Sequence, residues 1–176
     1  MPGLAEPSAL PSHARVTRPG GVRPVYYPDE RRRRDESGWT LVQGILAPVQ
    51  FLVFLVSLGL VLRYVATGRG YEVAMGSVVV KTVTLYLIMV TGSLWERAVF
   101  GRYLFAPSFY WEDVFSMLVL ALHTAYLVAL VAGASSGTLV TIALLAYASY
   151  VINAGQFVRK LRLARRQVAG RQERQA

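Results

Sequence analysis

Two long stretches of this chain carry no charged side chain. They run from Thr40 to Leu62 and, with His123 counted as neutral, from Val114 to Val158. About 20 helical residues at ~1.5 Å each cross the hydrocarbon core of a bilayer. The first stretch therefore predicts one membrane span, and the second is long enough for two.

A further span is predicted between these stretches, at about 73–95, and it contains Lys81. Turn residues at 133–137 divide the second long stretch into two helices. Lipid cannot satisfy open sheet edges, so a helical bundle is the only fold that this pattern allows. The sequence predicts an all-α bundle of four transmembrane helices, at about 39–64, 73–95, 114–132 and 138–158.

The predicted membrane domain, 38–160, lies between two basic tails. Residues 1–37 hold six of the eight prolines and no apolar run, which is typical of a disordered segment. Of the 19 Lys and Arg residues, seven precede the first apolar run and seven follow the last one, mostly in the C-terminal tail, 161–176. Basic residues beside membrane helices usually face the cytoplasm. Both ends are therefore predicted to be cytoplasmic, and the net charge of +9 indicates a membrane surface rather than nucleic acid.

The composition excludes several kinds of chemistry. The chain has no cysteine, which removes disulfides, thiolate nucleophiles and iron–sulfur clusters. Its two histidines are too few for a multi-histidine metal site within one chain. One chain therefore cannot form a cysteine-based or multi-histidine metal site.

Three carboxylic acids lie at neighbouring helix ends on the predicted cytoplasmic side: Glu96, Glu112 and Asp113. Paired carboxyl groups can act as acid and base when their environments differ. The alternative is structural, with Glu112 and Asp113 at a helix N-terminus and Glu96 paired with an arginine. The sequence leaves both interpretations open.

Aromatic side chains are dense near these acids. The candidates for contact with a flat ligand are Trp95, Tyr103, Tyr110 and Trp111. Such rings can stack on a planar molecule, but they also form aromatic belts at the membrane interface.

Two ionisable residues lie deeper in the predicted bundle. His123 is expected at a depth similar to that of Gln50, Tyr86 and Tyr150, where it can transfer a proton, ligate a metal carried by a substrate, or simply bond across helices. Lys81 is expected to extend its long side chain toward the membrane surface, or to pair with a substrate carboxylate. Ionisable groups within a membrane are costly and often functional.

Polar uncharged residues are expected to join the helices. Gln43, Gln50 and Ser57 recur every seven residues, so they share one helix face that should turn toward the other helices. Asn153 and Gln156 are likewise expected to hydrogen-bond between helices rather than to a ligand.

Several unusual strings in the sequence resemble one protein family, the 3-vinyl bacteriochlorophyllide hydratases. The resemblance covers roughly residues 23–163. Its strings are WTLVQGILAP at 39–48, MVTGSLWE at 89–96, FGRYLFAP at 100–107, WEDVFSM at 111–117, HTAY at 123–126 and YVINA at 150–154.

The resemblance implies a membrane-bound enzyme of bacteriochlorophyll synthesis in a phototrophic bacterium. Such an enzyme adds water across the 3-vinyl group of a magnesium chlorin, either chlorophyllide a or 3-vinyl bacteriochlorophyllide a, and forms a 1-hydroxyethyl group. It would reside in the cytoplasmic or intracytoplasmic photosynthetic membrane, and its magnesium would arrive with the substrate. The resemblance assigns no catalytic residue in this chain.

The implied reaction needs a proton donor, a positioned water and an aromatic binding surface. We favour Glu112, Asp113 or Glu96 as the donor, with His123 deeper, as an axial ligand to the substrate magnesium or a structural residue. The rival classes are a non-enzymatic pigment carrier or photosystem assembly protein and, because of Lys81, a small transporter. Neighbouring enzymes of the same synthesis and a second copy of the chain stay open as partners.

Overall fold

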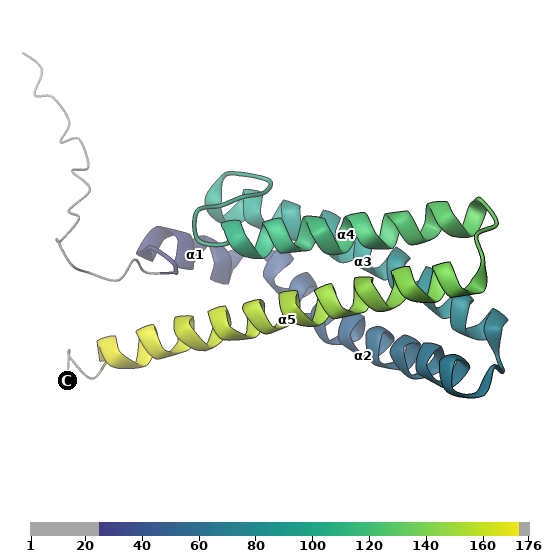
Figure 1. Ribbon diagram of the computed structural model, residues 1–176. Helices are drawn as coiled ribbons and strands as arrows, with labels where there is room; N and C mark the ends of the chain where they lie inside the picture. The colour runs from purple at the N-terminus through teal and green to yellow at the C-terminus, as the bar shows by residue number, and fades with distance from the viewer. Residues whose placement is uncertain (1–24, 173–176) are drawn as a thin grey trace, which may run out of the picture.

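All regular structure in the described part of the chain is helical (Figure 1). The computed structural model describes residues 25–172, with side chains up to residue 166. The helices are α1 (Pro28–Glu36), α2 (Gly38–Thr67), α3 (Tyr71–Phe100), α4 (Tyr110–Val131) and α5 (Ser136–Gln172).

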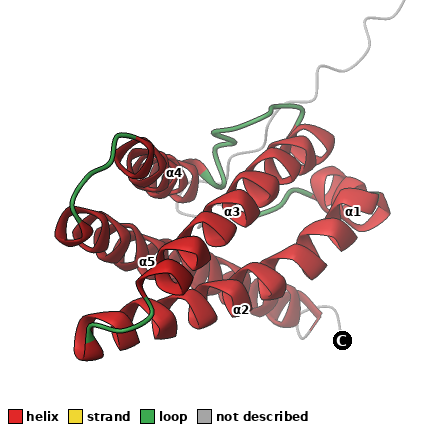
Figure 2. Ribbon diagram, turned by 90° about the vertical axis from the view of Figure 1, so that its right-hand side faces the viewer, coloured by secondary structure: helices red, strands yellow, loops and turns green. Residues whose placement is uncertain are grey.

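The four long helices form two antiparallel hairpins, α2 with α3 and α4 with α5, which pack against each other (Figures 1 and 2). Each of α2, α3, α4 and the Ser136–Arg166 part of α5 is long and apolar enough to cross a membrane. The predicted all-α fold with four candidate spans is therefore confirmed.

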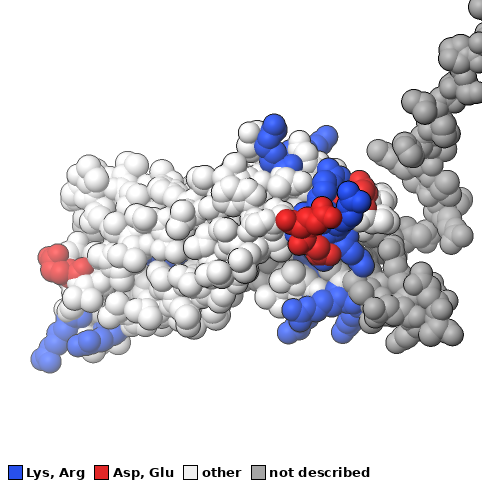
Figure 3. All heavy atoms as spheres, turned by 180° about the vertical axis from the view of Figure 1, so that it is seen from behind, with Lys and Arg blue, Asp and Glu red and all other residues white. Residues whose placement is uncertain are grey.

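Charged side chains gather at the two ends of the bundle, and the band between them is almost free of charge on the face in Figure 3. Large apolar side chains are exposed along the spans, including Leu41, Val56 and Val128 at 68%, 63% and 64%. Because water would not favour such a surface, these side chains are suited to contact lipid tails.

The interior between the hairpins is mainly aliphatic and aromatic. Phe54, Val78 and Val119 are buried there. The hydroxyl of Tyr126, on α4, donates to the carbonyl of Met75, on α3, at 3.0 Å. This bond satisfies a buried polar group and joins the two hairpins.

The helix α1 corrects the prediction of a disordered tail for residues 28–36. Pro28 occupies its first turn, where a missing N–H costs nothing, and the Glu30 carboxylate accepts the Tyr27 amide at 2.8 Å. These local signals start a helix that composition alone does not indicate. The tail up to residue 24 lies outside the described residues.

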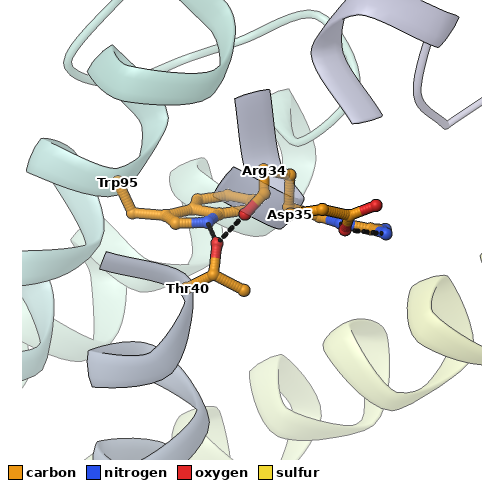
Figure 4. A network of polar contacts seen from close by, with 4 residues as sticks. All are labelled: Arg34, Asp35, Thr40 and Trp95. Carbon is orange, nitrogen blue, oxygen red and sulfur yellow. Dashed lines mark hydrogen bonds and ion pairs between the residues drawn. The ribbon is translucent and has the colours of Figure 1, made fainter. Parts of the chain in front are cut away.

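A chain of hydrogen bonds fixes α1 to the bundle (Figure 4). The indole N–H of Trp95, on α3, donates to the Thr40 hydroxyl, on α2, at 3.0 Å. That hydroxyl donates to the carbonyl of Arg34, on α1, at 2.6 Å. The Thr40 hydroxyl on α2 therefore connects α3 with α1.

The observed helices are longer than predicted. The helix predicted at 73–95 continues to Phe100. Gly101 caps it with a φ of 76°, which suits a residue without a Cβ. The helix predicted at 138–158 continues to Gln172. Membrane thickness limits the apolar part of a helix but not the helix itself, because Arg, Leu, Ala and Gln favour its continuation.

The polar face of α2 turns inward, as predicted. The Gln43 amide donates to the Thr91 hydroxyl on α3 at 2.8 Å, and Gln50 is 2% exposed. The Ser57 hydroxyl hydrogen-bonds with the hydroxyl groups of Ser77 and Tyr147, on α3 and α5. Buried polar groups in this bundle therefore help to select which helices become neighbours.

Candidate active site

Two carboxyl groups come together where α3 ends and α4 begins. Glu96 and Asp113 are 5% and 4% exposed. Consecutive amides of the 101–109 loop donate to them: Phe105 N–H to Asp113 Oδ2 at 2.7 Å, and Ala106 N–H to Glu96 Oε2 at 3.2 Å. The loop therefore holds both carboxyl groups in place.

The backbone of this loop is strained at Phe105. Its φ is 58°, in the left-handed region, and it is the one non-glycine residue with positive φ in the described chain. Such a conformation costs an ordinary residue about 1–2 kcal/mol. It persists only where surrounding contacts enforce it, and here it accompanies the two amide–carboxyl bonds.

The Glu96 and Asp113 carboxyl groups lie close to each other, because the N–H groups of two successive loop residues donate to them. Two negative charges that lie this close in a buried site repel each other, so a proton on one of the two groups is favoured. The pair therefore has the arrangement of a proton donor: a proton on one group, restricted access to water and fixed orientation.

Glu112 precedes Asp113 but faces another helix. Successive helical residues are about 100° apart around the axis, so Asp113 turns toward α3 and Glu112 toward α5. Its Oε1 lies 3.1 Å from Nζ of Lys160. Its Oε2 is buried and has no hydrogen-bond partner among the described residues. Glu112 thus has an ionic partner on one side and an unused acceptor on the other.

Further polar residues follow along the α4–α5 contact. Nδ2 of Asn153 donates to the Ser116 hydroxyl at 2.9 Å, so Asn153 joins these helices. Oδ1 of Asn153 and Oε1 of Gln156 are buried without partners in the described chain. Lys160 and Ser116 were not among the site residues predicted from the sequence. The signal was present in the spacing of residues 153, 156 and 160, which share one face of α5.

The aromatic candidates do not form one binding pocket. Trp95 packs edge-on against Phe100 and Phe109 inside a small apolar cluster. Tyr110 and Trp111 contact each other edge-on and are 48% and 67% exposed. Tyr103 lies under the Arg97 guanidinium, with 4.6 Å between Cζ and the ring centroid.

Lys81 does not extend to the membrane surface, so that expectation is wrong. Its side chain is fully buried, and its Nζ lies 4.0 Å from the centroid of the Tyr150 ring. No hydrogen-bond partner for Nζ occurs in the part of the chain that the structure describes. The contact with an aromatic face gives the amine a site inside the bundle.

His123 is also fully buried, near Lys81. Its Nδ1 lies 2.8 Å from the Val119 carbonyl, which only accepts, so Nδ1 carries the hydrogen and Nε2 presents a lone pair without a described partner. Gln50 and Tyr150 are also buried. The Tyr86 hydroxyl lies 2.8 Å from that of Thr124, the residue after His123, which agrees with the depth expected for Tyr86. At ~1.5 Å per residue, His123 is about 15 Å along α4 from Asp113. The structure thus holds two separate groups of ionisable residues.

Comparison with known proteins places these residues in context. Residues 26–163 match the family described as 2-vinyl bacteriochlorophyllide hydratase (BCHF). The chain belongs to this hydratase family. The match confirms the resemblance found in the sequence, with the vinyl group numbered 2 in this name, and it covers both groups of ionisable residues.

Two curated relatives carry the same hydratase name. A protein from Cereibacter sphaeroides is 64% identical over 143 residues, which cover 81% of this chain and 89% of the relative. A protein from Rhodobacter capsulatus is 62% identical over 145 residues, which cover 82% and 85%. No solved structure matches the chain. Membership in a hydratase family supports an enzyme rather than a pigment carrier or a transporter.

Proposed function

We propose that this protein adds water across the vinyl group of a bacteriochlorophyllide, a magnesium chlorin, to give a 1-hydroxyethyl group. The observation that carries the proposal is the buried Glu96–Asp113 pair, held by two loop amides, in a member of a hydratase family. Hydration begins with a proton, and this pair has the geometry to give one.

The pair protonates the terminal carbon of the vinyl group. Positive charge then develops on the inner carbon, where the conjugated macrocycle delocalises it. A water molecule adds to this carbon and loses a proton. No electrons are exchanged, so we expect no redox cofactor and no metal beyond the magnesium of the substrate.

The distance between the acids and His123 limits where the pigment can lie. The vinyl group is attached to the ring rim, closer to the magnesium than two helical turns, about 11 Å. Asp113 and His123 are about 15 Å apart along α4, so a vinyl group at the acids leaves His123 out of reach of the magnesium. We favour this arrangement, with Tyr103, Tyr110 and Trp111 at the same end contacting the pigment.

The competing arrangement makes His123 the axial ligand of the magnesium, through the free lone pair of Nε2. The absorption spectrum of bound pigment distinguishes the two. With the vinyl group at the acids, His123→Ala should leave the spectrum unchanged and should not lower the rate at saturating substrate by more than a few-fold. A changed spectrum would place the magnesium at His123 and the vinyl group deeper in the bundle.

The site lies at the membrane surface. The charged helix α1 and the basic part of α5 lie at the same end of the bundle as the carboxyl groups (Figure 1). Basic residues beside membrane spans favour a cytoplasmic location for that end. We therefore place the protein in the photosynthetic inner membrane with both termini and the carboxyl groups on the cytoplasmic side, where water is available.

One incubation tests the function. Purified protein in detergent is mixed with a vinyl magnesium chlorin, without cofactors and with a chelator that does not remove the pigment magnesium. Chromatography and mass spectrometry should show a more polar pigment that has gained one water. Pigment that binds but stays unchanged would support a carrier and overturn the proposal.

A further inference from the structure

Three buried side-chain oxygens on α4 and α5 have no hydrogen-bond partner in the described chain. They are Glu112 Oε2, Asn153 Oδ1 and Gln156 Oε1. Glu112 and Asn153 are 5% and 8% exposed. Buried acceptors without partners are costly, and several of them on one helix contact indicate that a small donor binds there.

Two of the three residues, Glu112 and Asn153, belong to contacts that join α4 and α5. Lys160 Nζ reaches Glu112 Oε1 at 3.1 Å, and Asn153 Nδ2 reaches the Ser116 hydroxyl at 2.9 Å. These contacts are two successive connections between α4 and α5. Gln156 lies between Asn153 and Lys160 on the same face of α5, so its amide falls between the two connections.

We propose that Glu112, Asn153 and Gln156 bind the water molecule that adds to the vinyl group, and that Glu112 accepts its proton. This inference rests on the proposed function and assigns separate roles within it. The Glu96–Asp113 pair gives the first proton, and the α4–α5 site supplies the water.

The chemistry of the three groups fits this role. All three oxygens are acceptors, so a water bound there points its two hydrogens at the protein and leaves its lone pairs free. A buried water typically makes two to four hydrogen bonds. Its two hydrogens can bond to two of these three acceptors at a time. Because a lone pair must attack the cation, this orientation favours addition.

The positions of the acids on α4 fit it as well. Asp113 turns toward α3 and Glu112 toward α5, about 100° apart. A vinyl group between α3, α4 and α5 would meet the proton donor on one side and the water on the other. Water forms the C–O bond with its lone pair, and its released proton passes to the Glu112 carboxylate. One hydrogen and one hydroxyl are added in total.

Deuterium separates the two steps. In D₂O, protonation of the vinyl group can reverse before water is captured, which leaves deuterium on the terminal carbon of unreacted pigment. Glu112→Gln should slow hydration about 10²-fold, and Asn153→Leu about tenfold, while deuterium still enters the vinyl group. Asp113→Asn should lose both hydration and deuterium exchange.

Two further variants keep the test decisive. Gln156→Leu removes an oxygen that bonds to nothing in the described chain, so it should fold normally and still slow hydration with exchange retained. Gln43→Leu is the matched control. It removes a side-chain hydrogen bond between α2 and α3 rather than one between α4 and α5, and the variant should hydrate the pigment within a few-fold of the unmodified rate.

Each result has one meaning. Glu112→Gln and Gln156→Leu variants that hydrate at the unmodified rate, or that lose exchange and hydration in parallel, would overturn the water site. If the unmodified protein itself neither hydrates nor exchanges, the proposed function fails instead.

Discussion

Lys160 Nζ lies 3.1 Å from Glu112 Oε1, and this ion pair joins the ends of α4 and α5 beside the carboxyl pair. The Lys160 side chain is 23% exposed, whereas that of Glu112 is 6% exposed. The lysine therefore brings a positive charge from the surface to a buried acidic side chain.

Replacing Lys160 should damage chemistry more than binding. We expect Lys160→Met to lower kcat about tenfold or more with little change in KM, because Glu112, the proposed base, loses the cation that lies beside it. Lys160→Arg preserves the charge and should recover most of the rate. Equal losses in the two variants would show that the lysine acts through shape alone.

The proposal that Glu96 and Asp113 act together as the proton donor predicts that neither acid is dispensable. Glu96→Gln or Asp113→Asn should lower kcat about 10²-fold or more while the protein still inserts and binds pigment. Either amide still accepts a loop N–H, so the loop should remain in place. Steady-state rates with pigment-binding titrations make the measurement. If both single variants keep the unmodified rate, the proton donor must be another residue.

Phe105 offers a test of the loop. Phe105→Gly should keep activity, because glycine adopts a φ of 58° readily and retains the N–H that binds Asp113. Phe105→Pro should lose activity and stability, since proline requires a φ near −65° and has no N–H. Turnover and thermal unfolding of both variants check this, and an active proline variant would contradict it.

Replacing Lys81 should have opposite effects on protein stability and on pigment binding. Lys81→Met should raise the melting temperature, because it removes a buried amine without a hydrogen-bond partner in the described chain. If Lys81 pairs with a substrate carboxylate, the same change should weaken pigment binding. A stabilised variant with unchanged affinity would restrict Lys81 to a structural role.

The orientation can be tested with reporter fusions. Fusions after Arg162 and before Arg31 should both report a cytoplasmic location, and one near Ser135 an external location. An external C-terminus would mean an odd number of spans and would contradict the four-span topology.

The sequence by itself determined the class of this protein. Long uncharged stretches specify membrane helices because lipid offers no partner for an open backbone, and two of the turns between them are visible as glycines at 68–70 and 133–137. The inward face of Gln43, Gln50 and Ser57 could also be predicted, because helical periodicity is a local property of the sequence. The strings at 39–48 and 111–117 indicated the hydratase family.

Only the tertiary structure decided which polar groups meet. Glu96 and Asp113 meet because an irregular loop, with Phe105 in a left-handed conformation, reverses the chain between them, and no periodicity predicts that path. Glu112 meets Lys160 because of how α4 lies on α5.

The burial of Lys81 against the Tyr150 ring also depends on tertiary packing. A lysine extends to the surface only if its neighbours leave a path, and helix packing determines those neighbours. Local periodicity therefore specifies the helices and their inward faces, whereas contacts between residues distant in the chain create the site.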